Sequence, residues 1–413
     1  MIIMTELSVS KWTLDRVSPT SFESLAGFAA IASLYAGSFD ALRLFFQLLV
    51  MIIVGMLWLR NAKLSLKYSY KGGLYATVLF LLAVYFSGVF LSFALSLERS
   101  LSVNDIGIFL LQGVMAAMLL LTAGYGRFAL AVGVWAVVFA LIDAAANLLG
   151  VVGWIDIREP VRLIDGAVQY AYPGLSGNTL AGGFVCFVAI CRLALAAEQV
   201  GSIRWIYYAL ILLLLVSLEL ISARRYLGLA LAAVTLFFIW RWISRIGLQW
   251  VSLGLASLFL ILTFTASEGD SGNWLRSSLM LNGISLALEN LIIGRGPTYV
   301  ALDGLTANYI ELSNAYVTES QLLDFAINYG TLSAFALFLA LLITLAAQSN
   351  SLHKYPAIIL TCMTAELFFG GSLSSFAGVL LFYSTLGACL ESLKRSRHSS
   401  ASLNKRCRKN EVS

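Results

Sequence analysis

The sequence predicts an all-α integral membrane protein, a polytopic bundle of about twelve transmembrane helices, with eleven as the alternative count. Composition is the first observation behind this prediction. Of the 413 residues, 60% are hydrophobic and 12% are charged, and the mean hydropathy is +0.86. These values exclude an ordinary soluble domain. The second observation is a series of apolar segments of spanning length, found with a window of about 19 residues. Because hydrocarbon offers backbone amides no other partners, we expect these segments to be helices.

The predicted spans follow one another through most of the chain. In order, they are 22–39, 42–59, 73–97, 106–123, 128–150, 179–197, 205–222, 226–240, 247–266, 321–346, 356–371 and 376–393. The first span is the weakest, because Glu23 and Gly27 dilute its apolar run, and without it the count is eleven. Residues 1–393 therefore form a single membrane domain, followed by a basic tail at 394–413.

The distribution of lysine and arginine predicts the orientation of the spans. Two basic clusters stand out: Arg60, Lys63, Lys67 and Lys71 in one loop, and Lys394, Arg395, Arg397, Lys405, Arg406, Arg408 and Lys409 in the tail. With twelve spans, both clusters and the N-terminus face one side, which the positive-inside rule assigns to the cytoplasm. The polar stretch 151–178 then forms an outer loop. The stretch 267–318 forms a larger outer loop between the ninth and tenth spans.

The large outer loop is the best candidate for a working surface. It contains Trp274, Tyr299, Tyr309 and Tyr316. Long loops are usually functional or disordered, and aromatic residues argue against disorder. The chain has no Walker A motif and no dinucleotide-binding glycine pattern, and its cysteines show no metal-ligand spacing. We therefore expect a membrane-borne substrate reached from outside, with no nucleotide cofactor, no metal and no nucleic-acid partner.

A few ionisable residues lie inside predicted spans. Asp143 and Asn147 are four residues apart on one helix face, Glu219 precedes two arginines, and Glu366 lies within the eleventh span. Such residues are costly in a membrane and tend to face the bundle interior. The structural interpretation is that Asp143 bonds a neighbouring helix and that Glu219 neutralises an arginine.

Four arginines on the outer side form a candidate anion site. Arg224 and Arg225 lie at the mouth of the eighth span, where a phosphate would meet guanidinium groups and the amides of a helix N-terminus. Arg276 follows the ninth span, and Arg295 lies between two glycines that would let the backbone approach a ligand.

A lipid-borne pyrophosphate would need two or three such cations near the bilayer surface. The alternative is that the arginines pair with carboxylates of the large loop. These are Glu268, Asp270, Glu289, Asp303 and Glu311.

Four motifs, taken in order, resemble a known family. They are Ser-Gly-Asn-Thr-Leu-Ala at 176–181, Ser-Ala-Arg-Arg-Tyr-Leu-Gly-Leu at 222–229, Leu-Ile-Ile-Gly-Arg-Gly-Pro at 291–297 and Thr-Glu-Ser-Gln-Leu-Leu-Asp-Phe-Ala-Ile-Asn-Tyr-Gly at 318–330. With Arg276 ahead of the third motif, this order resembles the O-antigen polymerase and O-antigen ligase superfamily of bacterial inner membranes. The resemblance covers roughly residues 175–345. It implies ten to fourteen helices, a large periplasmic loop, and glycan transfer from an undecaprenyl-pyrophosphate carrier without nucleotide or obligatory metal.

The resemblance also implies roles for single residues. Arg225 or Arg224, together with Arg276, would hold the pyrophosphate. Ligases of this family carry a histidine near the end of the large loop, whereas this chain has only His353 and His398, both on the predicted cytoplasmic side. The polymerase is therefore favoured over the ligase, with Glu319 as candidate base. The alternative role for Glu319 is capping of the tenth span.

Two other functions remain open from the sequence: an O-antigen ligase that transfers polymer to lipid A-core, and a lipid-linked oligosaccharide flippase or secondary transporter. A transporter of this kind often has two similar halves, which the sequence does not show. The family further implies an inner-membrane location and a periplasmic active site, while the basic clusters predict cytoplasmic termini. As partners it implies a chain-length regulator and a repeat-unit flippase.

Overall fold

The structure is a computed structural model of the chain, in which helices predominate. It describes residues 19–36, 39–65, 73–97, 106–107, 109–121, 125–156, 159–164, 167–172, 174–176, 179–200, 204–265, 271–296, 320–348, 354–370, 373 and 375–391. The helices are α2 (Ser21–Tyr35), α3 (Asp40–Ser65), α4 (Gly73–Ser96), α6 (Ala116–Leu121), α7 (Tyr125–Val151), α8 (Thr179–Gln199), α9 (Arg204–Leu220), α10 (Arg224–Phe238), α11 (Trp240–Ile246), α12 (Leu248–Thr265), α13 (Ser271–Glu289), α15 (Gln321–Tyr329), α16 (Thr331–Ala347), α17 (Lys354–Glu366) and a last helix at Phe376–Glu391. Each predicted apolar segment therefore contains a helix.

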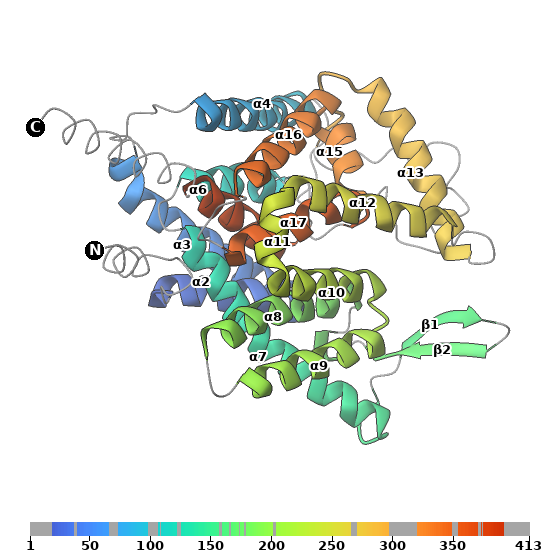
Figure 1. Cartoon of the computed structure of the whole chain (residues 1–413). Helices are drawn as coiled ribbons and strands as arrows, with labels where there is room; N and C mark the ends of the chain where they lie inside the picture. Colours follow the sequence, from blue (N-terminus) through green and yellow to red (C-terminus); the bar gives the residue numbers. More distant parts are fainter. Residues whose placement is uncertain are drawn as a thin grey trace, which may run out of the picture.

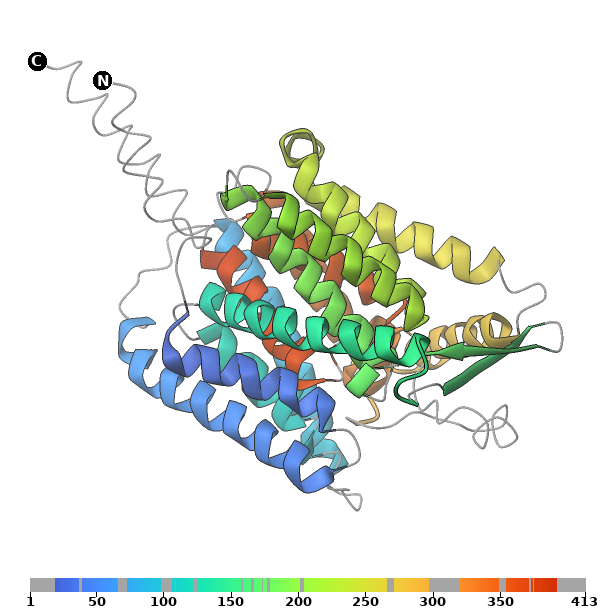
Figure 2. The same cartoon turned by 90° about the horizontal axis from the view of Figure 1, so that it is seen from below.

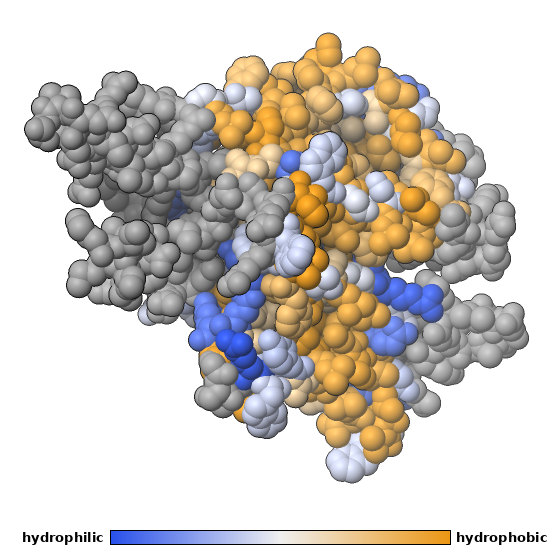
Figure 3. Space-filling view, in the orientation of Figure 1, coloured by the Kyte–Doolittle hydropathy of each residue, from blue (hydrophilic) through white to orange (hydrophobic). Residues whose placement is uncertain are grey.

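Four helices in the described part of the chain are long and apolar enough to cross a membrane. They are Ala41–Leu59, Gly73–Ser96, Gly126–Val151 and Thr179–Gln199. Shorter apolar helices accompany them, among them Leu248–Leu262 and Thr331–Ala347. Most of the described surface seen in Figure 3 is apolar. Large exposed hydrophobic surfaces of this extent are typical of contact with lipid.

The centre of the bundle is formed by α17 and the last helix. Every residue from Tyr355 to Glu366 is buried, and so is nearly all of the last helix. A helix that is apolar all round is expected in such a core. Helix α17 packs against α8, α10, α12 and α16 (Figure 1). The outer helices thus enclose a central pair that has little contact with the surroundings.

A β-hairpin and an additional helix occupy the two stretches predicted as outer loops. Strand β1 (Glu159–Ile164) pairs antiparallel with β2 (Ala167–Ala171), with an irregular register between Pro160 and Arg162. The all-α prediction is therefore incomplete at 151–178. Within 267–318, residues of α13 form a helix of 19 residues, where the prediction was a loop. Figures 1 and 2 both show the hairpin and α13 at the same end of the bundle.

The predicted tenth span is broken in the middle. Helix α15 ends at Tyr329 and α16 begins at Thr331, with Gly330 between them at a φ of 95°. Only glycine adopts this conformation readily. Before α6, residues Leu110–Met115 form a π-helical turn, whose Gln112 accepts a hydrogen bond from the Tyr329 hydroxyl at 2.6 Å. Irregular backbone of this kind inside a membrane bundle is tolerated where protein surrounds it, and it often marks function.

Candidate functional site

The turn between α9 and α10 positions two of the predicted arginines. Helix α10 begins at Arg224, so Arg224 and Arg225 occupy its first turn, as predicted. Ser222, just before it, has a φ of 59°, a left-handed conformation that is uncommon for residues other than glycine. The N-cap residue Ala223 provides no side-chain hydrogen bond. Local strain of this kind tends to occur at functional sites.

The charge at this helix start is opposite to the usual one. The N-terminus of a helix carries a partial positive charge, so acidic residues stabilise it, and cations there cost about 0.3–1 kcal/mol each. Helix α10 has two arginines and no acidic residue in its first turn. An anion such as phosphate would reverse this unfavourable arrangement, because it attracts both the guanidinium groups and the helix end.

The two arginines differ in how firmly they are held. The guanidinium of Arg225 lies over the Tyr226 ring, 4.9 Å from its centroid, and is partly buried. The Tyr226 ring is itself buried between α8 and α10, in contact with Phe184 and Phe187. A cation–π contact contributes about 0.5–2 kcal/mol. Arg224, by contrast, is exposed. One guanidinium is therefore oriented by the core and the other is accessible.

Buried polar contacts fix the base of the hairpin next to this turn. The amide of Tyr172 donates to the Leu220 carbonyl at 3.0 Å, which joins the hairpin to the end of α9. The carboxylate of Asp143, fully buried in α7, accepts hydrogen bonds from the Leu175 amide at 2.8 Å and from the Tyr35 hydroxyl at 2.5 Å. The predicted bond from Asp143 to a neighbouring helix is thus present. It anchors the chain segment that follows the hairpin.

Asn147 of α7 and Glu219 of α9 bear on the other predictions about polar residues inside the predicted spans. Asn147, also fully buried, donates to the Ser217 hydroxyl of α9 at 3.1 Å. Glu219 is exposed and forms no ion pair within the described part of the chain. Neither Arg224 nor Arg225 is paired with Glu219 in the described structure, and the interpretation that Glu219 neutralises an arginine stays a prediction for the arginine side chains outside the described residues.

Arg295 lies in the segment between α13 and α15, not at the α9–α10 turn, and has a carboxylate partner. Its Nη2 donates to Oε2 of Glu289 at 2.7 Å, and its Nε donates to Oδ1 of Asn290 at 3.3 Å. The side chains of Arg295 and Glu289 are 26% and 56% exposed, so the pair is open to solvent or lipid headgroups. Glu289 is one of the outer carboxylates that the sequence offered as an alternative partner for the arginines. A pyrophosphate at Arg295 would have to compete with it.

The two glycines around Arg295 serve protein packing. A Cβ on Gly294 would collide with the backbone of Asn328, and Gly296, at a φ of 115°, lies against Ser96 of α4. The amides of Arg295 and Gly296 donate to the carbonyls of Ile327 and Asn328 at 2.9 and 3.1 Å. The expectation that these glycines admit a ligand is wrong for Gly294, because the close neighbour is α15.

The start of α15 is fully engaged with the segment that follows α17. The amides of Gln321 and Leu322 donate to the carbonyls of Gly370 and Leu367 at 3.1 and 2.9 Å. The hydroxyl of the N-cap residue Ser320 donates to the Leu367 carbonyl at 3.2 Å. The predicted base Glu319 comes directly before Ser320 in the sequence but lies outside the described residues. For Arg276, the structure describes its place in α13 but not its side chain.

An aromatic contact links the basic turn to this second helix start. Gly228, one helical turn after Arg224, faces Phe259 of α12, whose ring an added Cβ would approach to 2.5 Å. Phe259 stacks on Phe369 with ring centroids 4.3 Å apart. Phe369 lies in the same short segment, 367–370, that binds the first amides of α15. Helix α10, which carries the arginine pair, is thus connected to the start of α15 through Phe259 of α12 and the segment 367–370.

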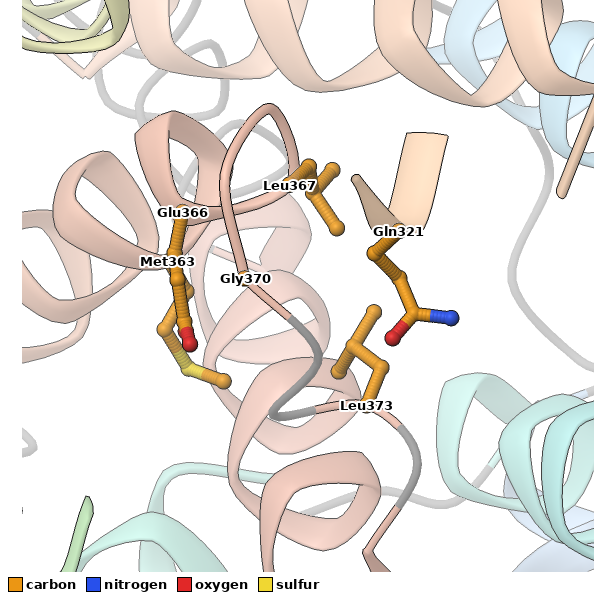
Figure 4. A pocket seen from close by; sticks show the side chains of 6 residues that line it. All are labelled: Gln321, Met363, Glu366, Leu367, Gly370 and Leu373. Carbon is orange, nitrogen blue, oxygen red and sulfur yellow. The ribbon is translucent and has the colours of Figure 1, made fainter. Parts of the chain in front are cut away.

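A small hollow lies beneath the start of α15 (Figure 4). It is lined by Gln321, Met363, Glu366, Leu367, Gly370 and Leu373. Glu366 is 3% exposed, and Gly370 leaves room for its carboxylate, since an added Cβ would lie 2.6 Å from its Oε1. The hollow has essentially no volume that a water molecule could occupy, far below the roughly 300 Å³ of a typical ligand pocket. In this conformation it does not fit a sugar unit.

Sequence reasoning found the arginine pair but missed what supports it. Tyr226 follows the pair directly, and Ser222 precedes it in the same motif. An aromatic residue beside an arginine at a helix start is a recognisable signal for a fixed guanidinium. The left-handed turn at Ser222 and the hydrogen bonds of Gln321 leave no pattern in the sequence, because they depend on neighbouring elements.

Comparisons with known protein families, with curated proteins and with solved structures find no match. A function can therefore be argued from the residues and from the geometry of the helices.

Proposed function

We propose that this chain is a membrane glycosyltransferase, a polymerase that joins undecaprenyl-pyrophosphate-linked oligosaccharide repeat units into O-antigen or a related surface polysaccharide. The observation that carries the proposal is the start of α10. Two arginines lie where the helix end disfavours cations, without a side-chain cap and next to a left-handed residue. A diphosphate near the bilayer surface is the ligand that such an arrangement would bind best.

In this proposal the chain lies in a bacterial inner membrane and makes about twelve crossings, with both termini in the cytoplasm. The hairpin, the α9–α10 turn and α13 would face the periplasm. The surface of α13 supports this arrangement. Leu281, Ile284 and Leu288 are exposed at helical spacing, while Met280 and Ala287 are buried against the protein. A helix with such an apolar outer face is suited to lie at a membrane surface.

The proposed reaction is a substitution at a sugar carbon. A hydroxyl of one repeat unit attacks the anomeric carbon of the growing chain, and the bond from that carbon to the pyrophosphate oxygen breaks. The electron pair leaves with the pyrophosphate, where Arg224 and Arg225, with Arg276 and Arg295, would stabilise the developing charge. Glu319 would take the proton of the attacking hydroxyl, a contribution of about 10²–10⁴ in rate. No metal or nucleotide enters this scheme.

The test is a set of substitutions in the bacterium that carries the gene. We expect R225Q and R276Q to lower polymerisation at least about 30-fold, because removal of one partner of a desolvated charge contact costs about 2–5 kcal/mol. The measurement is the length ladder of the surface polysaccharide, with protein level in the membrane as a check. R204Q is the matched control, since Arg204 is exposed at the opposite end of α9 and bonds the Val200 carbonyl.

The same experiment separates the alternatives. A polymerase defect leaves single repeat units on the surface glycolipid. A defect in an O-antigen ligase leaves no repeat unit on the lipid A-core, and a defect in a flippase or transporter leaves the lipid-linked unit on the cytoplasmic side. A wild-type ladder for both R225Q and R276Q would overturn the proposal, as would labelling that places residue 276 in the cytoplasm.

A further inference from the structure

Two buried polar side chains of α7 contact the elements that form the α9–α10 turn. Asp143 and Asn147 are both fully buried, and their spacing of four residues puts them on one helix face. The Nδ2 of Asn147 donates to the Ser217 hydroxyl at 3.1 Å. Ser217 belongs to the last turn of α9, which ends at Leu220. Asn147 therefore ties α7 directly to the end of α9.

Asp143 reaches the same helix end through the chain that follows the hairpin. Its Oδ1 accepts from the Leu175 amide at 2.8 Å, and a Cβ added to Gly174 would lie 2.6 Å from this oxygen. Gly174 has a φ of 68°, which glycine adopts readily, so the backbone can pass close to the carboxylate. The Tyr172 amide then donates to the Leu220 carbonyl at 3.0 Å. The end of α9 is thus connected to α7 at two points.

Helix α8 packs against the other side of the turn. A Cβ added to Gly183 would lie 2.7 Å from the Cβ of Ala223 and 2.6 Å from the Cδ2 of Tyr226. Ala223 is the N-cap of α10, and the Tyr226 ring carries the guanidinium of Arg225. A left-handed residue such as Ser222 persists only where its surroundings determine its conformation. The contacts from α7 and α8 provide such surroundings.

We propose that Asp143 and Asn147 are positioning residues, which hold the α9–α10 turn so that Arg225 is directed at the diphosphate of a lipid-linked glycan. The ligand comes from the function proposed above, on which this inference rests, whereas the hydrogen bonds come from the structure. Neither residue touches the ligand. They act through the end of α9, where a shift of about 1 Å in a binding group is sufficient to weaken its contact with a ligand.

The first measurement uses the purified full-length protein in detergent, without ligand. Hydrogen–deuterium exchange, read by mass spectrometry, reports how firmly the amides of residues 218–227 are held. We expect D143A and N147A to speed this exchange about tenfold, because each removes a buried hydrogen bond. D143N keeps an oxygen that accepts from the Leu175 amide, so its exchange should stay within about twofold of the wild type.

The matched control is Q348A, at the end of α16. The Nε2 of the buried Gln348 donates to the Cys389 carbonyl of the last helix at 2.8 Å. Q348A therefore also removes a buried hydrogen bond between two helices, but one that does not involve α7, α9 or α10. It should lower the unfolding temperature and leave the exchange of residues 218–227 unchanged.

The second measurement is the dissociation constant of farnesyl diphosphate, a small lipid diphosphate used as the probe. We expect D143A and N147A to bind it about tenfold more weakly than the wild type, because Arg225 is no longer held in place. D143N and Q348A should bind it as the wild type does. If D143A does not fold, N147A provides both measurements.

Unchanged exchange in D143A and N147A would overturn the proposal, and so would faster exchange with unchanged binding of farnesyl diphosphate. A loss of binding in Q348A as large as in D143A would overturn it too, since any buried hydrogen bond would then have the same effect. Failure of the proposed function gives a different result: a wild-type polymer ladder for R225Q, with exchange and binding still altered in D143A.

Discussion

Helices α10 and α15 both begin at short turns near the hairpin end of the bundle, and they satisfy their first amides in different ways. At α15, Ser320 is the cap, and the carbonyls of Leu367 and Gly370 accept from the next two amides. An acidic residue, Asp324, follows in the first turn. At α10 the cap is an alanine without a side-chain hydrogen bond, and the first turn is basic.

In the function proposed above, this difference separates a structural helix start from one that binds a ligand. The first four amides of any helix lack intrahelical partners and need side chains, water or ligands. The protein itself provides partners to α15, and so the start of α15 is fixed by the segment after α17. The start of α10 carries an excess of positive charge that the protein does not neutralise with an acidic residue in that turn. Of the two helix starts, α10 is therefore the one at which the proposal places an external anion.

The largest expected effect is the loss of the packing that holds the α15 region. G294A would push a Cβ into the backbone of Asn328, which a side-chain rotation cannot relieve. We expect it to lower the free energy of unfolding by at least about 3 kcal/mol, so that little folded protein remains. Thermal unfolding of the purified protein, or its yield after extraction from membranes, measures this loss.

Gly254 of α12 provides the matched control for this substitution. Nothing lies within 4 Å of a Cβ placed there, so G254A should keep or slightly raise the unfolding temperature. Equal stability of G294A and G254A would contradict the close approach of the two backbones.

Much of the fold can be predicted from hydropathy, and the exceptions have physical reasons. A run of apolar residues is sufficient for a helix in a membrane, so each predicted segment contains one. The hairpin at 159–171 was missed because its strands, of six and five residues, are much shorter than the window of about 19 residues that finds spans. Helix α13 was read as a loop because Ser277, Asn282 and Gly283 interrupt its apolar residues. Gly330 interrupts the tenth segment with a positive φ. The sequence does not predict this break, because the conformation of Gly330 is set by the packing of the folded protein.

The candidate site was predictable only in part. The motif around Arg224 and Arg225 indicates a basic helix start, and α10 begins there. The glycines beside Arg295 were assigned to a ligand, because a sequence cannot show which surface a glycine approaches. The pairing of Arg295 with Glu289 was among several alternatives, and geometry selects it. Residue roles at Glu319 and Arg276 stay predictions, since their side chains lie outside the described residues.

A smaller effect is expected when the α15 cap is removed. S320A deletes the hydroxyl that donates to the Leu367 carbonyl and accepts from the Leu323 amide. Because the residue is buried, we expect a loss of about 1–2 kcal/mol in the free energy of unfolding. T235A, which removes an exposed hydroxyl bonded within α10, is the control and should change stability little. If S320A is as stable as T235A, the cap does not hold this helix start.

The smallest change in stability, and the most informative one, is expected at Arg224. This side chain is exposed, so replacing it removes no packing. R224E places an acid where the helix end favours one, and R224Q places a neutral group there. We expect the unfolding temperature to rise from wild type to R224Q to R224E, with about 0.6–2 kcal/mol between wild type and R224E.

Activity should change in the opposite direction, because an acid at this position repels the pyrophosphate that the arginine would attract. The polymer ladder should shorten from wild type to R224Q to R224E. A protein that gains stability and loses function at the same residue has a helix start adapted to an external anion, since a purely structural arginine would affect both in the same direction. If R224E is less stable than wild type, or equally active, the contrast between α10 and α15 does not reflect ligand binding.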